Sequence, residues 1–330
     1  MGVNMIEVEE ARQTLDDEQS IQAFDDIVYQ RVLGASKHIS MIGDMIESIA
    51  LIGEKNHSSI HSVVDKIKTL SQYFIETRGA ASQAISNAIN IMIKNIDEVR
   101  NLDVEEASKV IIQKKNNYLI QSEKAINKVV KYGVEAASSM KTIMVFDYSS
   151  TVNKWLQNLK NENKNYTIVI PESRIINGGY PFIEACREAG HQIKFIPDAA
   201  IMYYLKECDG AFFGAETFYP DGTTFNTTGS DIVGLVCKEF NIPLYVLTPM
   251  IKVDIRAIYG YKKQLKINDL TEELASNWDS SVKSKIDFNC PELLGVESKY
   301  ITAIITEEGI IPANQLFNNS KKFHDSLKGE

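Results

Sequence analysis

The chain has 330 residues, of which 44% are hydrophobic, and it carries a formal net charge of −9. This length suffices for one large domain or two ordinary ones, and the apolar content excludes a globally disordered chain. The acidic balance excludes a nucleic-acid-binding surface spread over the protein, but it is compatible with a local cationic pocket for a small phosphate ester.

Neither a membrane span nor a secretion signal is expected. No apolar run approaches the length of a span, and residues 1–20 are acidic and lack the apolar core of a signal peptide. The four cysteines form no CxxC pair, which favours buried free thiols over disulfides or metal ligands. These cysteines are Cys186, Cys208, Cys237 and Cys290. We therefore expect a cytoplasmic protein that binds neither membranes nor nucleic acid.

The first part of the chain has the spacing of helices. Residues 1–19 are mostly polar and are expected to form a loose N-terminal segment. From about Ser20 apolar residues recur at helical spacing, as in Ile60, Val63, Val64 and Ile67, and proline is absent up to Val134. We predict a helical bundle domain over residues 20–138. Its five helices are expected near residues 20–34, 37–53, 57–75, 79–96 and 103–137.

Near Met140 the pattern changes to short β-branched and aromatic runs that alternate with helical segments. This alternation predicts a Rossmann-like domain over residues 139–330, with a doubly wound parallel sheet. The expected strands are Thr142–Phe146, Tyr166–Ile170, Gln192–Ile196, Gly210–Gly214, Pro243–Leu247 and Tyr300–Ile305. The expected helices lie near residues 151–162, 180–190, 199–207 and 228–240. Residues 260–290 break the alternation and are expected to form an insertion that returns to the last strand.

The strongest candidate site lies between Cys208 and Ser230. An apolar run ends at Glu216, a turn signal follows, and Asn226 then precedes a run of hydroxyls and glycine, Thr227–Ser230, that can cap the next helix. Ligands of open α/β sheets bind at the carboxyl ends of strands, and helix N-termini attract anions. This stretch therefore combines a carboxylate, an amide and a helix start at one predicted sheet edge.

Three other strand-end loops carry polar groups. The hydroxyls and amides of Asp147–Thr151 could hold a phosphate or simply cap a helix. In Glu172–Arg174, followed by Asn177–Gly179, a cation lies next to a glycine-rich helix start, which suits an anion; the alternative is an Arg–Glu pair beside an ordinary loop. The loop Thr248–Asp254 contributes Lys252 as a possible phosphate cation.

The helical domain adds one polar element, Thr77–Ala81, at a predicted helix start. An arginine there opposes the helix dipole, so Arg78 either faces an anion or points to solvent. His57 and His61 have i,i+4 spacing but no third ligand, which favours a solvated helix face over zinc. The sequence contains no GxGxxG, Walker or HExxH motif, and we expect no cofactor and no metal.

The order of these motifs resembles one superfamily. TRGAASQAISNAI is followed by ESR…NGG, FIPDAA, GAETFYPDGTTFNTTGS, IPLYV and YITAIITEEGIIP. This order is similar to that of the alpha, beta and delta subunits of translation initiation factor 2B, the ribose-1,5-bisphosphate isomerases and the methylthioribose-1-phosphate isomerases. The resemblance covers roughly residues 20–315. It implies a helical domain joined to a Rossmann-like domain, usually dimerised through the latter.

The resemblance also implies a sugar-phosphate pocket. Its expected phosphate and hydroxyl contacts are Arg78, Gly79, Arg174, Asn226, Thr227 and Lys252. Isomerase members carry a catalytic cysteine after the first strand and an aspartate in a GAD motif. In this chain Tyr148 stands where we expect the cysteine, Glu216 replaces the aspartate, and Thr227 replaces a lysine.

These departures leave two functional interpretations. The first is aldose–ketose isomerisation of a phosphorylated sugar, with Glu216 as proton carrier and Tyr148 or Ser149 assisting, because a carboxylate and a second ionisable group can form an acid/base pair. The alternative is a non-catalytic regulatory subunit, similar to those of initiation factor 2B, that acts through protein contacts. The expected partners are a phosphorylated sugar and a second copy of the chain, bound through the C-terminal domain.

Overall fold

A computed structural model describes residues 6–32, 34–159 and 165–328. The chain divides into two compact units: unit 1 comprises residues 1–124 and 323–330, and unit 2 comprises residues 125–322. The division falls inside the long helix α7 (Val104–Ala136), whereas the predicted boundary near residues 138–141 follows the end of that helix.

Unit 1 is a helical bundle, as predicted. Besides the first part of α7 it contains α1 (Val8–Arg12), α2 (Glu18–Val28), α3 (Ala35–Lys55), α4 (Ile60–Glu76), α5 (Arg78–Ala81), α6 (Gln83–Met92) and the 3-10 helix η1 (Ile96–Asn101). The apolar faces that gave the helical spacing are buried: Phe24, Ile42, Ile67 and Phe74 have no exposed surface. A predicted helix over residues 79–96 is interrupted, because α5 ends at Ala81 and α6 ends at Met92.

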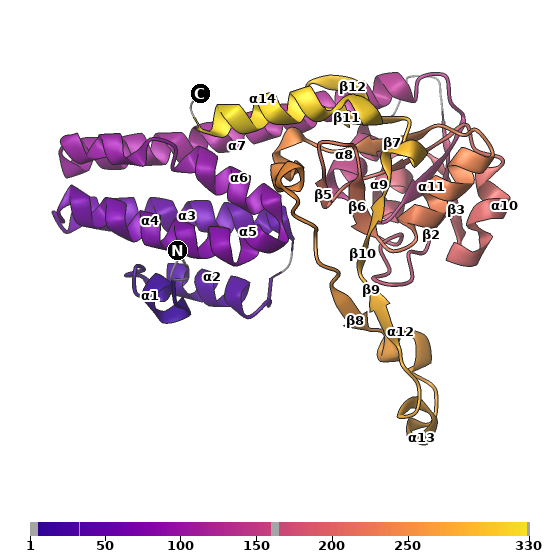
Figure 1. Ribbon diagram of the computed structural model, residues 1–330, viewed down its shortest axis with the longest axis horizontal. Helices are drawn as coiled ribbons and strands as arrows, with labels where there is room; N and C mark the ends of the chain where they lie inside the picture. The colour runs from indigo at the N-terminus through magenta and orange to yellow at the C-terminus, as the bar shows by residue number, and fades with distance from the viewer. Residues whose placement is uncertain (1–5, 33, 160–164, 329–330) are drawn as a thin grey trace. The chain divides into compact units, whose positions relative to one another are not determined.

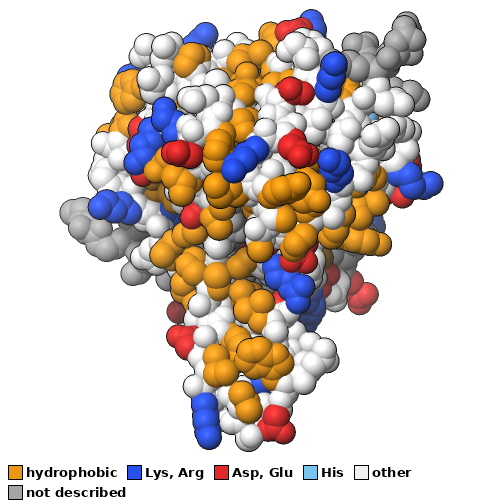
Figure 2. Space-filling view, turned by 90° about the vertical axis from the view of Figure 1, so that its right-hand side faces the viewer, with side chains coloured by type: hydrophobic (Ala, Val, Ile, Leu, Met, Phe, Trp, Pro, Cys, Tyr) orange, Lys and Arg blue, Asp and Glu red, His pale blue; other side chains and the backbone are white. Residues whose placement is uncertain are grey.

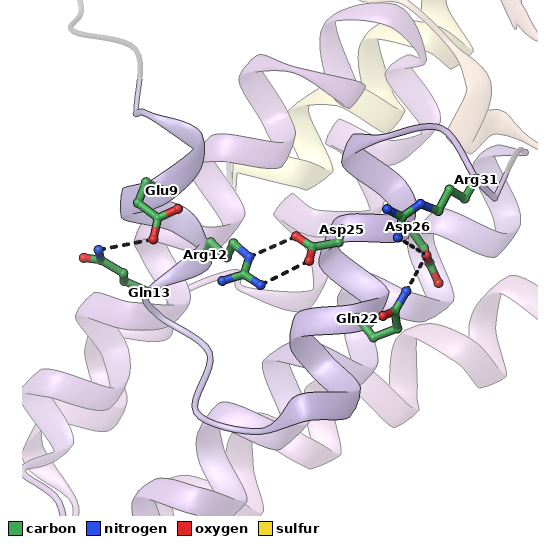
Figure 3. Close-up of polar contacts among 7 residues, drawn as sticks. All are labelled: Glu9, Arg12, Gln13, Gln22, Asp25, Asp26 and Arg31. Carbon is green, nitrogen blue, oxygen red and sulfur yellow. Dashed lines mark hydrogen bonds and ion pairs between the residues drawn. The ribbon is translucent and has the colours of Figure 1, made fainter.

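The expected loose segment contains helical structure. Residues 1–5 lie outside the described part, but α1 is helical, and Ala11 and Leu15 are buried. Arg12 donates from Nε and Nη2 to the two carboxylate oxygens of Asp25, at 3.0 and 3.1 Å, and so links α1 to α2 (Figure 3). The apolar side chains and this paired geometry explain the order of a stretch that is polar overall.

Unit 2 is built on a seven-stranded sheet of order β12-β11-β7-β4-β1-β2-β3 (Figure 1). All its strand pairings are parallel except the antiparallel pairing of β11 with the edge strand β12. The strand β12 was not among the predicted strands. The strands are β1 (Thr142–Phe146), β2 (Thr167–Pro171), β3 (Gln192–Ile196), β4 (Gly210–Phe213), β7 (Leu244–Leu247), β11 (Ala303–Thr306) and β12 (Gly309–Pro312). The fold is therefore the predicted one, a helical region followed by a Rossmann-like sheet.

Helices between the strands cover the sheet. They are α8 (Ser150–Asn158), α9 (Phe182–Ala189), α10 (Ile201–Leu205) and α11 (Ser230–Glu239). Trp155 of α8 is fully buried and stacks on Phe212 of β4, with ring centroids 4.5 Å apart. The last residues predicted for the helix over 151–162 lie outside the described residues. Across the described ranges, no helix is long and apolar enough to cross a membrane.

Two segments after β4 form structure of their own. Three short strands, β5 (Thr217–Phe218), β6 (Thr224–Thr227) and β10 (Leu293–Val296), make a small antiparallel sheet of order β10-β6-β5. The predicted insertion contains β8 (Ile267–Asp269), α12 (Thr271–Ala275), α13 (Ser280–Lys283) and β9 (Asn289–Pro291). We call residues 265–291 the arm, because they project from the rest of unit 2 (Figure 1).

Candidate functional site

The sheet of unit 2 reverses its strand order between β1 and β4. From β1 the chain proceeds outward to β2 and β3, and it then returns to place β4 on the other side of β1. At such a switch point the connections leave in opposite directions, and ligands of open α/β sheets bind at the carboxyl ends of the strands there. Asp147 directly follows β1, and Gly214, Ala215 and Glu216 directly follow β4. Two carboxyl groups therefore lie on the loops at this switch point.

Asp147 is held at the end of β1 by hydroxyl groups from two distant segments. Ser173 Oγ donates to its Oδ1 at 2.9 Å, and Thr227 Oγ1 donates to its Oδ2 at 2.7 Å. The side chain is buried, and its backbone has a left-handed φ of 59°. Burial raises the pKa of the Asp147 carboxyl above its ordinary value, and the two hydroxyl hydrogen bonds oppose this rise.

The glycine Gly178 makes this position possible. A Cβ built on Gly178 would overlap Asp147 Oδ1 and would lie 3.0 Å from its Cγ and 3.2 Å from the backbone nitrogen of Tyr148. The glycine-rich loop after β2 therefore packs directly on the carboxyl group. Gly178 of the Asn177–Gly179 motif therefore allows the loop after β2 to approach the loop after β1 closely.

Glu216 lies in a cationic environment. Lys252 donates from Nζ to the carbonyl oxygen of Ala215 at 2.6 Å. Burial lowers the pKa of the Lys252 ammonium, and the negative charge of Glu216 opposes this effect. Burial likewise lowers the pKa of Lys263, and among the neighbouring charges Glu216 opposes this effect most strongly. Glu216 thus lies within electrostatic reach of two partly desolvated lysines.

Asn226 and Thr227 are both buried in β6. Asn226 pairs with Leu294 of β10, and its Nδ2 donates to Ser230 Oγ, the first residue of α11, at 2.9 Å. Gly229, with a φ of 107°, precedes this helix. The predicted grouping of an amide with a helix start is therefore present, whereas the Thr227 hydroxyl faces Asp147.

Tyr148 and Ser149 follow Asp147 in the chain but lie in different surroundings. Tyr148 is 44% exposed, and its ring packs on Phe182 with centroids 5.6 Å apart. Ser149 Oγ accepts from the backbone N–H of Val152 at 3.5 Å and so caps α8, which was one of the two roles considered for this loop. A Cβ on Gly214 would overlap Ser149 Oγ, so Ser149 borders the loop after β4.

Arg174 lies on the loop after β2 with an exposed side chain. It forms a 3.5 Å ion pair with Glu172, and its Nη2 donates to the carbonyl oxygen of Glu273 in the arm at 3.1 Å. The backbone N–H groups of Ser173 and Arg174 donate to the two carboxylate oxygens of Asp198, at 2.9 and 2.8 Å. In the structure the anion at this loop is therefore an internal carboxylate.

Arg78 and Gly79 belong to unit 1. Arg78 Nη2 donates to the carbonyl oxygens of Ile27 and Val28, at 2.5 and 2.7 Å. These carbonyls lie at the C-terminal end of α2, where a cation is favoured by the helix dipole. A Cβ on Gly79 would overlap Ser86 Oγ and would lie 3.1 Å from its Cβ, so α5 and α6 approach closely at this glycine.

Unit 2 thus brings together Asp147, Ser173, Thr227 and Asn226, and separately Glu216 and Lys252. Sequence reasoning placed Asp147 and Ser173 in candidate loops but named neither as a site residue. The available signal was an acidic residue directly after a buried strand, but a polar residue at that place also reads as an ordinary turn or cap.

The cysteines and possible metal ligands lie apart from these groups. Cys186, Cys208 and Cys237 are buried free thiols, and Cys290 is a partly exposed free thiol. Burial raises the pKa of each of the first three to about 12. Among residues 6–32, 34–159 and 165–328, no three His, Cys, Asp or Glu side chains are grouped so that they could hold a metal ion.

A parallel sheet with carboxyl and ammonium groups at its switch point is typical of proteins that bind a small ligand at the end of the sheet. The chain belongs to the Initiation factor 2 subunit family, whose sequence model matches residues 36–313. This membership confirms the resemblance inferred from the order of the motifs.

The relatives of this chain fall into two groups by their names. The chain is 24% identical to the ribose 1,5-bisphosphate isomerase of Archaeoglobus fulgidus, over 91% of this chain and 92% of the relative. It is also 24% identical to a putative translation initiation factor eIF-2B subunit 2-like protein of Pyrococcus furiosus, over 89% of this chain and 96% of the relative. The family therefore contains both sugar-phosphate isomerases and initiation-factor subunits.

Solved structures share the fold at low identity. The 5-methylthioribose 1-phosphate isomerase of Pyrococcus horikoshii OT3 superposes with a TM-score of 0.72 at 18% identity, covering 97% of this chain and 88% of the other. The translation initiation factor eIF-2B of the same organism gives a TM-score of 0.71 at 19% identity, covering 90% and 98%. The likeness extends over both the helical region and the sheet.

Proposed function

We propose that unit 2 binds a phosphorylated sugar at the carboxyl ends of β1 and β4. The observation that carries this proposal is the position of Asp147, Glu216 and Lys252, on loops that border or contact the switch point. Carboxyl groups and amides are suited to sugar hydroxyls, and an ammonium group is suited to phosphate. Family membership supports the same ligand class, because several relatives are sugar-phosphate isomerases.

The proposed contacts can be divided by their place in the structure. Lys252 would bind phosphate, and the amide of Asn226 and the hydroxyl of Thr227 would bind sugar hydroxyls or phosphate near the start of α11. Arg174 would add a cation from the loop after β2. Arg78 and Gly79 are a separate part of the proposal, in which the start of α5 in unit 1 binds phosphate.

Calorimetric titration with pentose and hexose phosphates tests the binding step. We expect Lys252→Met to weaken binding at least about tenfold, which is about 1.4 kcal/mol and a modest value for a charge-assisted contact. Lys262→Met is the matched control, because Lys262 is exposed. Equal ligand affinities of the wild type and Lys252→Met would show that Lys252 does not bind the ligand. If the folded wild type bound no sugar phosphate, the proposal would be contradicted.

The activity we propose is aldose–ketose isomerisation, with Glu216 as a proton carrier and Tyr148 or Ser149 as further candidates for an assisting role. Glu216→Gln keeps the size of the side chain and removes its ability to take up a proton. We expect this variant to bind the ligand but to lose turnover by about 100-fold or more. Retained turnover in Glu216→Gln would assign the proton transfer to another group.

A second candidate function is a non-catalytic regulatory subunit that works through protein contacts. The arm favours it, because several apolar arm side chains are exposed, and hydrophobic groups gather over the tapering lower end in Figure 2. These side chains are Leu265, Ile267, Leu274, Trp278, Val282 and Ile286. Ligand binding without turnover of any sugar phosphate would support this function over the isomerase.

We also propose a cytoplasmic location and a homodimer formed through unit 2. A relative from Chaetomium thermophilum, the eIF2B-beta2-delta2 complex, is described as tetrameric, which supports self-association as a property to test. Exposed apolar side chains on α11, Ile232 and Leu235, provide candidate contact area. Sedimentation equilibrium of the wild type and of Leu235→Glu would test it, with a monomeric wild type as the contradicting result.

A further inference from the structure

We propose that Asp147 is the catalytic carboxyl that exchanges protons with the oxygen atoms of the bound sugar, while Glu216 moves the carbon-bound proton. This inference rests on the proposed isomerase function and assigns the assisting role to a residue other than Tyr148 or Ser149. It follows from the position of Asp147 at the switch point, from its burial and from its hydrogen-bond partners.

The hydrogen bonds of Asp147 are of the kind that a sugar makes. Both carboxyl oxygens are bound to hydroxyl groups, Ser173 Oγ at 2.9 Å and Thr227 Oγ1 at 2.7 Å. A sugar hydroxyl can replace either one at little cost in hydrogen-bond energy, because a hydroxyl donor is exchanged for a hydroxyl donor. Tyr148 lacks such an arrangement, since its ring is 44% exposed and packs on Phe182.

The two carboxyl groups differ in their electrostatic surroundings. Asp147 is 3% exposed and faces neutral hydroxyls, with Asp198 as a nearby negative charge. Glu216 lies within electrostatic reach of Lys252 and Lys263. Desolvation favours the protonated form of a carboxyl, so Asp147 is suited to donate a proton. Glu216 is the other carboxyl on the loops at the switch point, and it has the acceptor role in this proposal.

The backbone around Asp147 is arranged at some energetic cost. A φ of 59° is uncommon for a residue with a Cβ, and such conformations cluster at functional sites. Gly178 leaves the carboxyl its space, since a Cβ there would overlap Asp147 Oδ1. The chain thus fixes this side chain between three loops rather than letting it reach solvent.

The proposed proton transfers balance. In the first half, the Glu216 carboxylate removes the proton from the carbon that becomes the carbonyl carbon. The electrons of that C–H bond form a double bond between this carbon and the neighbouring carbon. At the neighbouring carbon, a C–O bonding pair moves onto the oxygen atom. This oxygen atom then takes the proton of Asp147. In the second half, Asp147 takes the hydroxyl proton of the first carbon, the carbonyl forms, and Glu216 returns its proton to the neighbouring carbon. Both carboxyl groups end as they began.

Asp147→Asn tests this role, because it keeps the shape of the side chain and can still bond to both hydroxyls, to one as acceptor and to the other as donor, but removes proton exchange. We expect kcat to fall by about 100-fold or more with ligand affinity changed by less than about threefold. Asp209→Asn is the matched control, since Asp209 binds the N–H groups of Lys141 and Thr142 at the opposite end of β1. We expect that variant to keep kcat within about threefold.

The outcomes separate this inference from the function on which it rests. Turnover by the wild type with similar turnover by Asp147→Asn would overturn the role of Asp147 and leave the isomerase standing. Ligand binding by the wild type without turnover would overturn the role while leaving the binding site. Absence of sugar-phosphate binding by the folded wild type would overturn both.

A second variant keeps the test decisive if Asp147→Asn does not fold. Thr227→Val removes a hydrogen bond that opposes the rise in the pKa of Asp147. If protonated Asp147 is the acid, kcat falls as pH rises through its pKa, and this limb of the pH profile should lie at higher pH in Thr227→Val. A purely structural Asp147 predicts an unshifted limb.

Discussion

The packing of Gly178 on Asp147 gives a quantitative prediction for the centre of the candidate site. In Gly178→Ala the new Cβ would overlap Asp147 Oδ1 and would lie 3.0 Å from Cγ, closer than ordinary van der Waals contact. The carboxyl group must move, which strains its bonds to Ser173 and Thr227, at 2.9 and 2.7 Å. Overpacking costs about 1–3 kcal/mol and one lost hydrogen bond about 1 kcal/mol. We therefore expect a loss of about 2–4 kcal/mol in the free energy of unfolding.

Urea unfolding of a double-mutant cycle with Asp147→Ala measures this effect. The alanine removes the clashing carboxyl, so Gly178→Ala should cost less than about 1 kcal/mol in that background, where only the 3.2 Å approach to Tyr148 N remains. The reasoning is refuted if Gly178→Ala costs less than about 0.5 kcal/mol in the wild type, or if the costs of the two substitutions add.

Three further predictions concern the core, the thiols and pH. Trp155→Ala should cost about 3–5 kcal/mol in urea unfolding, because Trp155 is fully buried and stacks on Phe212; a cost below about 2 kcal/mol would contradict this packing. A thiol reagent should modify native protein at Cys290 alone and reach the three buried cysteines only on unfolding, whereas fast labelling that persists in Cys290→Ser would contradict the structure. As pH rises above about 3.9, the ordinary Asp pKa, unfolded wild-type protein loses the proton of Asp147, whereas the raised pKa keeps it in the folded state. The wild type therefore loses stability over this range, and Asp147→Asn, which has no such proton, should gain stability relative to it. Parallel stability–pH curves of the two proteins would contradict that raised pKa.

The inner strands of the main sheet could be predicted because they are buried on both faces, as β1 is. β1 matches its predicted bounds, since its apolar run is limited by residues that favour turns or helices, and the largely exposed edge strand β3 matches its predicted bounds as well. The small sheet could not be predicted in the same way. β6 (Thr224–Thr227) consists largely of hydroxyl and amide residues, and its pairing with β10 joins segments about 70 residues apart. Its strand character is set by tertiary contacts, which outweigh local propensity.

Part of the candidate site could be proposed from the sequence. Glu216 lies just after a predicted strand and Lys252 in the loop after the next one, and the structure places the two within electrostatic reach of each other. The contribution of Asp147 depends on Ser173 and Thr227, which are 26 and 80 residues away in the sequence. A buried hydroxyl–carboxyl network of this kind leaves only an ambiguous local signal, because each residue alone also resembles a helix cap or a turn.

A crystal structure of the protein with a bound sugar phosphate would test the central claim most directly. We predict that the ligand lies at the carboxyl ends of β1 and β4, with phosphate within hydrogen-bonding distance of Lys252 Nζ and with sugar oxygens in contact with Asp147 or Glu216. A ligand bound elsewhere in unit 2, with the switch point still filled by the bonds of Ser173 and Thr227 to Asp147, would contradict the account.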